Sequence, residues 1–198
     1  MKNNNCYSKG ELGLMRWSQK VRGVILTPLL SYLEKISIKP DHITVLSLIT
    51  GLSSAALFYF SNTVALLMIF VHVLLDSIDG PLARHTGKSS NKGSFADSAV
   101  DQTVLAAIIF VLINLEIVSP IAGGIHILLY TIAVGFAMIR NSIGISYSFL
   151  LRPRFFFYIW LVMELFFYPE TINYLLWACN IMLIPAVVIG FIKIRNFI

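Results

Sequence analysis

The 198-residue sequence is poor in charge, since Asp, Glu, Lys and Arg make up only 13% of it. A soluble globular domain carries about 25%, which argues against a water-soluble protein. Cysteine is also scarce, and Cys6 lies in a polar segment whereas Cys179 lies in an apolar run. This placement predicts neither a disulfide nor a zinc site. Hydrophobic residues make up 57% of the sequence, and we expect one membrane-embedded domain over residues 1–198.

Six apolar runs predict an all-α integral membrane protein, because a backbone in lipid has to satisfy its own hydrogen bonds. They form a predicted six-helix bundle over residues 43–193. The predicted spans are Ile43–Phe60, Thr63–Asp79, Phe95–Val118, Ile121–Ile139, Arg154–Tyr168 and Thr171–Phe191. The fifth run is short, and we expect its helix to extend backward past Arg152. Pro81 follows the second run, and we expect the helix to end or bend there.

The positively charged residues indicate how the spans are oriented. All 15 Lys and Arg residues precede the first run, follow the last, or lie in the second-to-third and fourth-to-fifth connections. The positive-inside rule therefore places both termini in the cytoplasm. This distribution also explains the net charge of +5, so no nucleic-acid partner is predicted.

Residues 11–36, before the first run, have apolar residues at helix-like spacing with basic residues among them. This pattern predicts a juxtamembrane amphipathic helix on the cytoplasmic leaflet, with Trp17 and Tyr32 at the interface. A helix that packs against the bundle has the same pattern, and the two roles are compatible.

Four aspartates, Asp76, Asp79, Asp97 and Asp101, lie in or beside the second and third runs. Carboxylates are costly at membrane depth, so a cluster of them there indicates a function. Each pair has the spacing of neighbours on one helix face. The second span runs toward the cytoplasm and the third away from it, so the pairs meet in the inner half of the bilayer. Together they can bind one or two Mg²⁺ or Mn²⁺ ions.

Cation transporters and channels also contain intramembrane carboxylates, which line an ion path. Here the four aspartates gather on one side of the membrane, and the sequence has no internal repeat of the kind that many transporters show. A structural membrane subunit leaves the aspartates unexplained. These observations favour a metal-dependent enzyme over both alternatives.

From Asp76 to Asp101 the sequence reads D-x2-D-G-x2-A-R-x8-G-x3-D-x3-D, which resembles the signature of the CDP-alcohol phosphatidyltransferases. Lys39–Thr44 (KPDHIT) resembles the motif with which that family begins its first span. Gln102 is a departure, because many relatives have Arg there. The resemblance implies a phosphotransferase of phospholipid biosynthesis. It would transfer a phosphatidyl group from a CDP-linked lipid, of the CDP-diacylglycerol type, to an alcohol and release CMP.

The resemblance also implies a role for each matching residue. Asp76, Asp79 and Asp97 would bind Mg²⁺ or Mn²⁺. Asp101 would be the general base, alone or as a metal ligand as well. The residues that would contact the nucleotide are Gly80, Ala83, Arg84, Gly93, Asp41 and Thr44.

The alcohol acceptor is not identified by the signature. Arg140, Arg152 and Arg154 lie at the cytoplasmic ends of the fourth and fifth spans. An anionic acceptor, such as a sugar phosphate or polyol phosphate, could dock on them. The alternative is that they only orient the spans. Small residues such as Gly51 allow close helix contacts, and relatives are commonly dimers, so a homodimer is a further hypothesis.

Two other residues are predicted to have structural roles. His72 lies one turn before Asp76, and we interpret it as a core histidine with a hydrogen-bond partner. Glu164 lies late in the fifth span, near the outer face, and we expect it to stabilise the fold.

Overall fold

The computed structural model describes residues 26–144 and 153–197, and every regular element in these ranges is a helix. A first helix covers residues 26–35. The others are α2 (Pro40–Leu57), α3 (Asn62–His85), α4 (Asn91–Asn114), α5 (Pro120–Ile143), α6 (Pro153–Phe166) and α7 (Ile172–Arg195). The predicted all-α class is confirmed for this part of the chain, and each predicted span corresponds to one helix.

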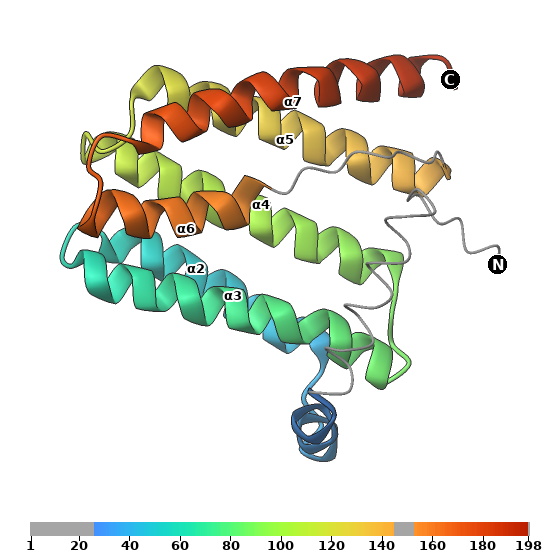
Figure 1. Cartoon of the computed structure of the whole chain (residues 1–198). Helices are drawn as coiled ribbons and strands as arrows, with labels where there is room; N and C mark the ends of the chain where they lie inside the picture. Colours follow the sequence, from blue (N-terminus) through green and yellow to red (C-terminus); the bar gives the residue numbers. More distant parts are fainter. Residues whose placement is uncertain (1–25, 145–152, 198) are drawn as a thin grey trace.

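Helices α2 to α7 run side by side in one bundle (Figure 1). Helix α2 packs against α3 and α4, and α5 packs against α7. Helices α4 and α6 lie between the α2–α3 pair and the α5–α7 pair (Figure 1). The buried side chains of α4 are Val104, Leu105, Ile108, Ile109 and Leu112. The first half of α4, with Asp97 and Asp101, is therefore anchored by a buried second half.

The outer surface of the bundle is apolar. Large side chains such as Ile49, Phe70, Phe110 and Ile181 are exposed on different helices. Apolar patches of this extent are rare on soluble monomers, but they carry no penalty against lipid tails. By length and composition α3, α4, α7 and the Pro120–Arg140 part of α5 can each cross a membrane. The chain is a multi-pass membrane protein.

These four helices are fewer than the six predicted spans. Helix α6 has 14 residues, or about 21 Å at the helical rise, against a hydrocarbon core of about 30 Å. Its predicted extension past Arg152 lies outside the described residues. Helix α2 has 18 residues, but Asp41 and His42 in its first turn shorten the apolar stretch. Six spans therefore remain a prediction.

Of the two alternatives predicted for Pro81, a helix end is wrong, because α3 continues to His85 with Pro81 buried inside it. The turn that ends the helix lies at Gly87, whose φ of 66° is left-handed. Glycine adopts this conformation without strain. The Lys88 N–H then donates to the Ala83 carbonyl at 2.8 Å, an arrangement typical of helix ends. The glycine, and not the proline, sets the length of α3.

The helix of residues 26–35 lies across the ends of α2 and α3 (Figure 1). Leu30 is buried and packs in a small cluster with Leu82 of α3, whereas Tyr32 is 60% exposed. This helix therefore packs against the bundle on one face and exposes Tyr32 on another, whereas its position on the cytoplasmic leaflet stays a prediction. Residues 11–25 of the predicted amphipathic helix lie outside the described ranges.

Candidate active site

The aspartates of α3 and α4 lie at similar depths because the two helices are antiparallel neighbours in sequence. Asp76 lies nine residues before the end of α3 at His85, and Asp97 lies six residues after the start of α4 at Asn91. At the helical rise these positions are roughly 9–14 Å from the loop that joins the helices. The side chain of Ser90 begins α4 by accepting the Gly93 N–H at 3.0 Å. This cap sets the residue at which α4 begins, and with it the positions of Asp97 and Asp101 along the helix.

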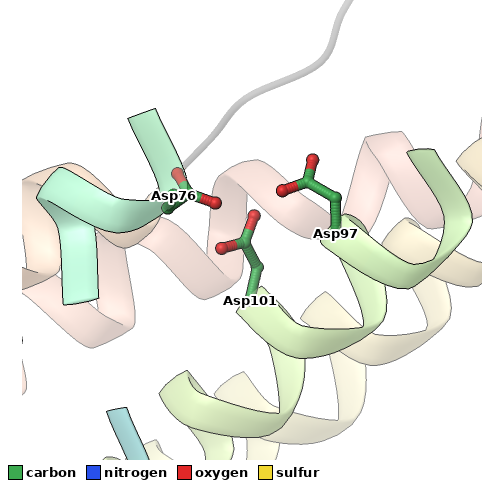
Figure 2. A group of neighbouring side chains, drawn as sticks. All are labelled: Asp76, Asp97 and Asp101. Carbon is green, nitrogen blue, oxygen red and sulfur yellow. The ribbon is translucent and has the colours of Figure 1, made fainter. Parts of the chain in front are cut away.

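Asp76, Asp97 and Asp101 point toward one another across the space between α3 and α4, as Figure 2 shows. One carboxylate oxygen from each lies within 4.8 Å of the other two. Mg²⁺ and related hard cations bind oxygens at about 2.0–2.6 Å, so these three oxygens are close enough for a small closure around one ion to make all of them ligands. The Oδ1 atom of Asp101 is buried and has no hydrogen-bond partner among the described residues. A buried oxygen without a donor is costly, and a cation would satisfy it. The three residues fit a divalent metal.

Asp79, the fourth predicted metal ligand, lies outside this group of three. Its Oδ2 atom accepts a hydrogen bond of 2.8 Å from the Thr44 hydroxyl of α2. The Asp79 residue is only 6% exposed. A charge-assisted bond of this kind holds a carboxylate firmly, so Asp79 connects α2 to the acidic site.

Arg154 of α6 contacts two aspartates of the acidic group. Its Nη2 donates to Oδ2 of Asp76 at 2.9 Å, and its Nη1 pairs with Oδ2 of Asp101. The sequence left open whether Arg154 receives the acceptor or only orients its span, and the structure brings this guanidinium to two of the predicted metal ligands. Arg140 of α5 is also buried, and its Nε donates to the Phe136 carbonyl of its own helix at 3.2 Å. Arg152 lies outside the described residues.

A cavity of about 220 Å³ opens beside the aspartates, between α2, α3 and the start of α4. Asp79 and Asp97 lie in its wall, and Asp97 also belongs to the acidic group, so the cavity borders that group. Its lining includes all six residues that were predicted to contact the nucleotide: Asp41, Thr44, Gly80, Ala83, Arg84 and Gly93. Residues that belong to two separate sequence motifs therefore surround one space.

Small residues keep this cavity open. A Cβ added to Gly80 would lie 3.5 Å from Nη1 of Arg84, and one added to Gly93 would lie 3.5 Å from the Ser90 hydroxyl. Both are ordinary contact distances, so neither glycine is required for packing against protein atoms. Their missing side chains leave room for a ligand that approaches the backbone closely.

Sequence reasoning missed several polar residues of the cavity wall. They are Lys88, Ser89, Ser90 and Ser94. All four lie in the variable part of the signature or next to Gly93, where the spacing fixes no residue type. A serine that begins a helix is a recognisable N-cap signal, and Ser90 could have been found in this way.

The two residues with predicted structural roles have them. His72 is buried, and its Nδ1 lies 2.8 Å from the Ser47 hydroxyl of α2. Glu164 accepts backbone N–H bonds from Glu170, Thr171 and Ile172 at 2.6–2.8 Å. Its carboxylate thus satisfies donors at the start of α7.

Comparison with known proteins identifies the class to which this site belongs. The family model for CDP-alcohol phosphatidyltransferase matches residues 37–192. This match covers more than half of the chain and includes both motifs and the cavity. The chain belongs to the CDP-alcohol phosphatidyltransferase family, and the predicted resemblance is confirmed.

Individual relatives match shorter stretches. An archaetidylinositol phosphate synthase of Pyrococcus horikoshii is 37% identical over 79 residues, which are 39% of this chain and 42% of that protein. A CDP-diacylglycerol–serine O-phosphatidyltransferase of Methanocaldococcus jannaschii is 38% identical over 69 residues, which are 35% of this chain and 31% of that protein. The chain thus matches less than half the length of either relative.

One solved structure has the same fold over most of the chain. It is a Mycobacterium tuberculosis phosphatidylinositol phosphate synthase with CDP-DAG bound, and its TM-score is 0.71 at 20% identity. The match covers 84% of this chain and 92% of that structure. At this identity the likeness establishes the fold of the bundle.

Proposed function

We propose that this protein is a metal-dependent CDP-alcohol phosphatidyltransferase of phospholipid biosynthesis. It transfers a phosphatidyl group from a CDP-linked lipid, of the CDP-diacylglycerol type, to an alcohol and releases CMP. The observation that carries the proposal is that Asp97 belongs both to the cavity wall and to the acidic group of Asp76, Asp97 and Asp101. Family membership leaves the ion-path alternative without support.

The cavity is proposed to bind the nucleotide end of the lipid substrate. Gly80, Ala83 and Gly93 leave space beside the backbone, and Arg84 and Lys88 bring positive charge to the same wall. Guanidinium and ammonium groups are the usual protein partners of phosphates. Asp41 and Thr44 would contact the nucleotide from α2.

Mg²⁺ or Mn²⁺ is the proposed cofactor, held by Asp76, Asp97 and Asp101, with Asp79 as a further ligand. Both ions prefer carboxylate oxygens. When bound, such an ion neutralises the charge of a diphosphate and of the departing phosphate. Asp79 keeps its Thr44 bond on the cavity side, where it can also orient the substrate.

Asp101 is the proposed general base. Its Oδ1 atom is buried and accepts no hydrogen bond from any described residue, while its Oδ2 atom pairs with Arg154. The carboxylate is thus held through Oδ2. As the base, Asp101 would use Oδ1 to take the proton of the acceptor hydroxyl as that hydroxyl attacks the lipid phosphate. The ion is the other proposed partner of Oδ1, and the Mn²⁺ affinity of Asp101→Asn distinguishes the two. A positioned base of this kind contributes about 10²–10⁴ in rate.

The acceptor is proposed to be a small anionic alcohol, such as a sugar phosphate or polyol phosphate. Relatives named as inositol phosphate synthases support this class, whereas the relative named as a serine transferase supports a zwitterionic one. Arg140 on α5, Arg154 on α6 and Arg152 between these helices are the candidate docking residues. Arg154 would approach the acceptor from its place beside Asp101.

We also propose six spans with both termini and the active site on the cytoplasmic side. The loop between α3 and α4 contains Lys88, and Lys92 is the second residue of α4, after its Ser90 cap. A site near this basic loop lets a soluble acceptor enter from the cytoplasm while the acyl chains stay in lipid. Homodimer formation remains a hypothesis, which the mass of the purified protein in nanodiscs would test.

The proposal is tested by incubating the purified protein with CDP-diacylglycerol and a panel of alcohols, with Mg²⁺ or Mn²⁺ or with a chelator. The panel holds inositol phosphate, glycerol phosphate, free inositol and serine. We expect CMP release that needs a divalent ion and is fastest with a phosphorylated alcohol. CMP release with serine alone would overturn the anionic acceptor, and no metal-dependent CMP release with any member would overturn the enzymatic proposal.

A further inference from the structure

We propose that Arg154 is a positioning residue for the metal site, which holds the carboxylates of Asp76 and Asp101 so that their remaining oxygens can face a divalent cation. This inference rests on the metal site of the proposed function. It concerns a residue outside the signature, on a helix that supplies none of the aspartates. It also differs from acceptor docking, because the group that Arg154 serves is the metal.

The first support is geometric. The two terminal nitrogens of one guanidinium bind two different carboxylates, with Nη2 2.9 Å from Oδ2 of Asp76 and Nη1 paired with Oδ2 of Asp101. Arg154 is buried, at 6% exposure. In both contacts the guanidinium binds the Oδ2 atom of the aspartate. Each aspartate therefore has a second oxygen, and that of Asp101 is the buried Oδ1 atom without a hydrogen-bond partner among the described residues.

The second support is the way the helices pack. Helices α3 and α4 each pack closely against α2, but they are not among the helix pairs with extensive contacts to each other. The distance between Asp76 and the α4 aspartates is thus not set by direct packing of α3 on α4. Arg154 joins the two helices at the level of the carboxylates, and this contact also brings α6 to the site.

The third support is charge. Three ionised carboxylates within 4.8 Å of one another repel strongly in a poorly solvated site. One guanidinium reduces their summed charge from −3 to −2, which is the charge that one divalent ion balances. Arginine suits this task because its donors form a rigid planar fork. The Arg154 guanidinium also lies 4.7 Å from the centre of the Phe155 ring, which restricts its orientation.

The contacts of Arg154 with the two aspartates also fit the opposite role, competition with the metal, and an experiment can distinguish the two roles. If the cation needs the same Oδ2 atoms, the guanidinium competes with it, and removing Arg154 strengthens metal binding. If Arg154 positions the ligands, removing it weakens metal binding, because outer partners of metal ligands typically contribute about 10–100-fold to affinity. The two interpretations predict changes of opposite sign.

The experiment is a Mn²⁺ titration of the full chain in nanodiscs. Electron paramagnetic resonance measures the amounts of free and bound ion at each point. It compares wild type, Arg154→Gln, Arg154→Lys and the control Arg195→Gln, which removes an exposed cation from the last turn of α7. We expect Arg154→Gln to weaken Mn²⁺ binding about 10–100-fold. Arg154→Lys should weaken it by a smaller factor, because an ammonium keeps the charge but lacks the fork. Arg195→Gln should bind like wild type.

Thermal unfolding and CMP binding by the same variants show whether the fold is intact, and the lysine variant keeps the test valid if the glutamine variant does not fold. In an Asp101→Asn background, Arg154→Gln should cost much less affinity, because one of the two bridged carboxylates is already gone. Unchanged or tighter Mn²⁺ binding by both Arg154 variants overturns the positioning role alone. Absence of Mn²⁺ binding by wild type overturns the metal site of the proposed function, and the positioning role with it.

Discussion

Thr44 on α2 donates a hydrogen bond of 2.8 Å to Asp79 on α3, although the two residues are 35 positions apart in the sequence. Thr44 ends the motif that begins the first predicted span, and Asp79 belongs to the aspartate signature. Both line the same cavity. The bond explains why two separate motifs make up one site: the hydroxyl of the first orients a carboxylate of the second.

Replacing Thr44 with valine should therefore impair binding of the CDP-lipid. Valine keeps the shape of threonine but removes the donor, and a hydrogen bond to a charged group contributes about 1.5–3 kcal/mol. We expect the KM for CDP-diacylglycerol to rise about 10-fold or more, with a lower Tm. The measurement is steady-state CMP release at varied CDP-lipid concentration.

The matched control is Thr50→Val on the same helix. The Thr50 hydroxyl donates to the Leu46 and Ser47 carbonyls of its own helix, both at 3.0 Å, and it does not line the cavity. We expect its KM to stay close to that of wild type. Equal KM values for the two valine variants would show that the bond to Asp79 does not serve the substrate.

Gly80→Ala should reduce activity without unfolding the protein. The added methyl group would lie 3.5 Å from Arg84 Nη1, an ordinary contact, but it would occupy space in the cavity wall. We expect CMP affinity to fall about 10-fold or more, because a ligand that approaches the backbone closely meets the methyl group. Calorimetric titration with CMP measures this effect.

Gly124→Ala is the control for this substitution, since among the described residues a Cβ there meets nothing within 4 Å beyond the backbone of its own helix. It should leave both CMP affinity and Tm near their wild-type values. If Gly80→Ala binds CMP as tightly as Gly124→Ala does, the nucleotide does not approach α3 at this position.

The helices and the helix faces of the aspartates were largely predictable from the sequence because both depend on local rules. Apolar runs of about 20 residues have few alternatives to a membrane helix. The three- and four-residue spacing of the aspartates fixes their helix faces whatever the packing. The six residues predicted to contact the nucleotide came from the family resemblance, and the structure brings all of them to one cavity.

What could not be predicted depends on contacts between distant helices. Nothing in the sequence near Arg154 indicates that its guanidinium reaches Asp76, 78 positions away. Positive residues near span ends are also explained by orientation in the membrane, so the charge alone carries no information about a partner. The end of α3 was missed because, in sequence, Pro81 is a stronger signal of a helix end than Gly87. In the structure the helix tolerates the proline and continues to His85.

Asp101→Asn should separate chemistry from binding. The amide keeps the size of the side chain but is a poor proton acceptor, so the rate of CMP release at saturating substrates should fall about 10²–10⁴-fold. CMP affinity should stay near wild type, because Asp101 does not line the cavity.

A Mn²⁺ titration of the same variant decides between the two roles that the sequence left open for Asp101. Unchanged Mn²⁺ affinity indicates a base alone, whereas weakened affinity indicates a base that also binds the metal. Near-normal turnover would remove Asp101 as the base and leave that task to another group near the acceptor.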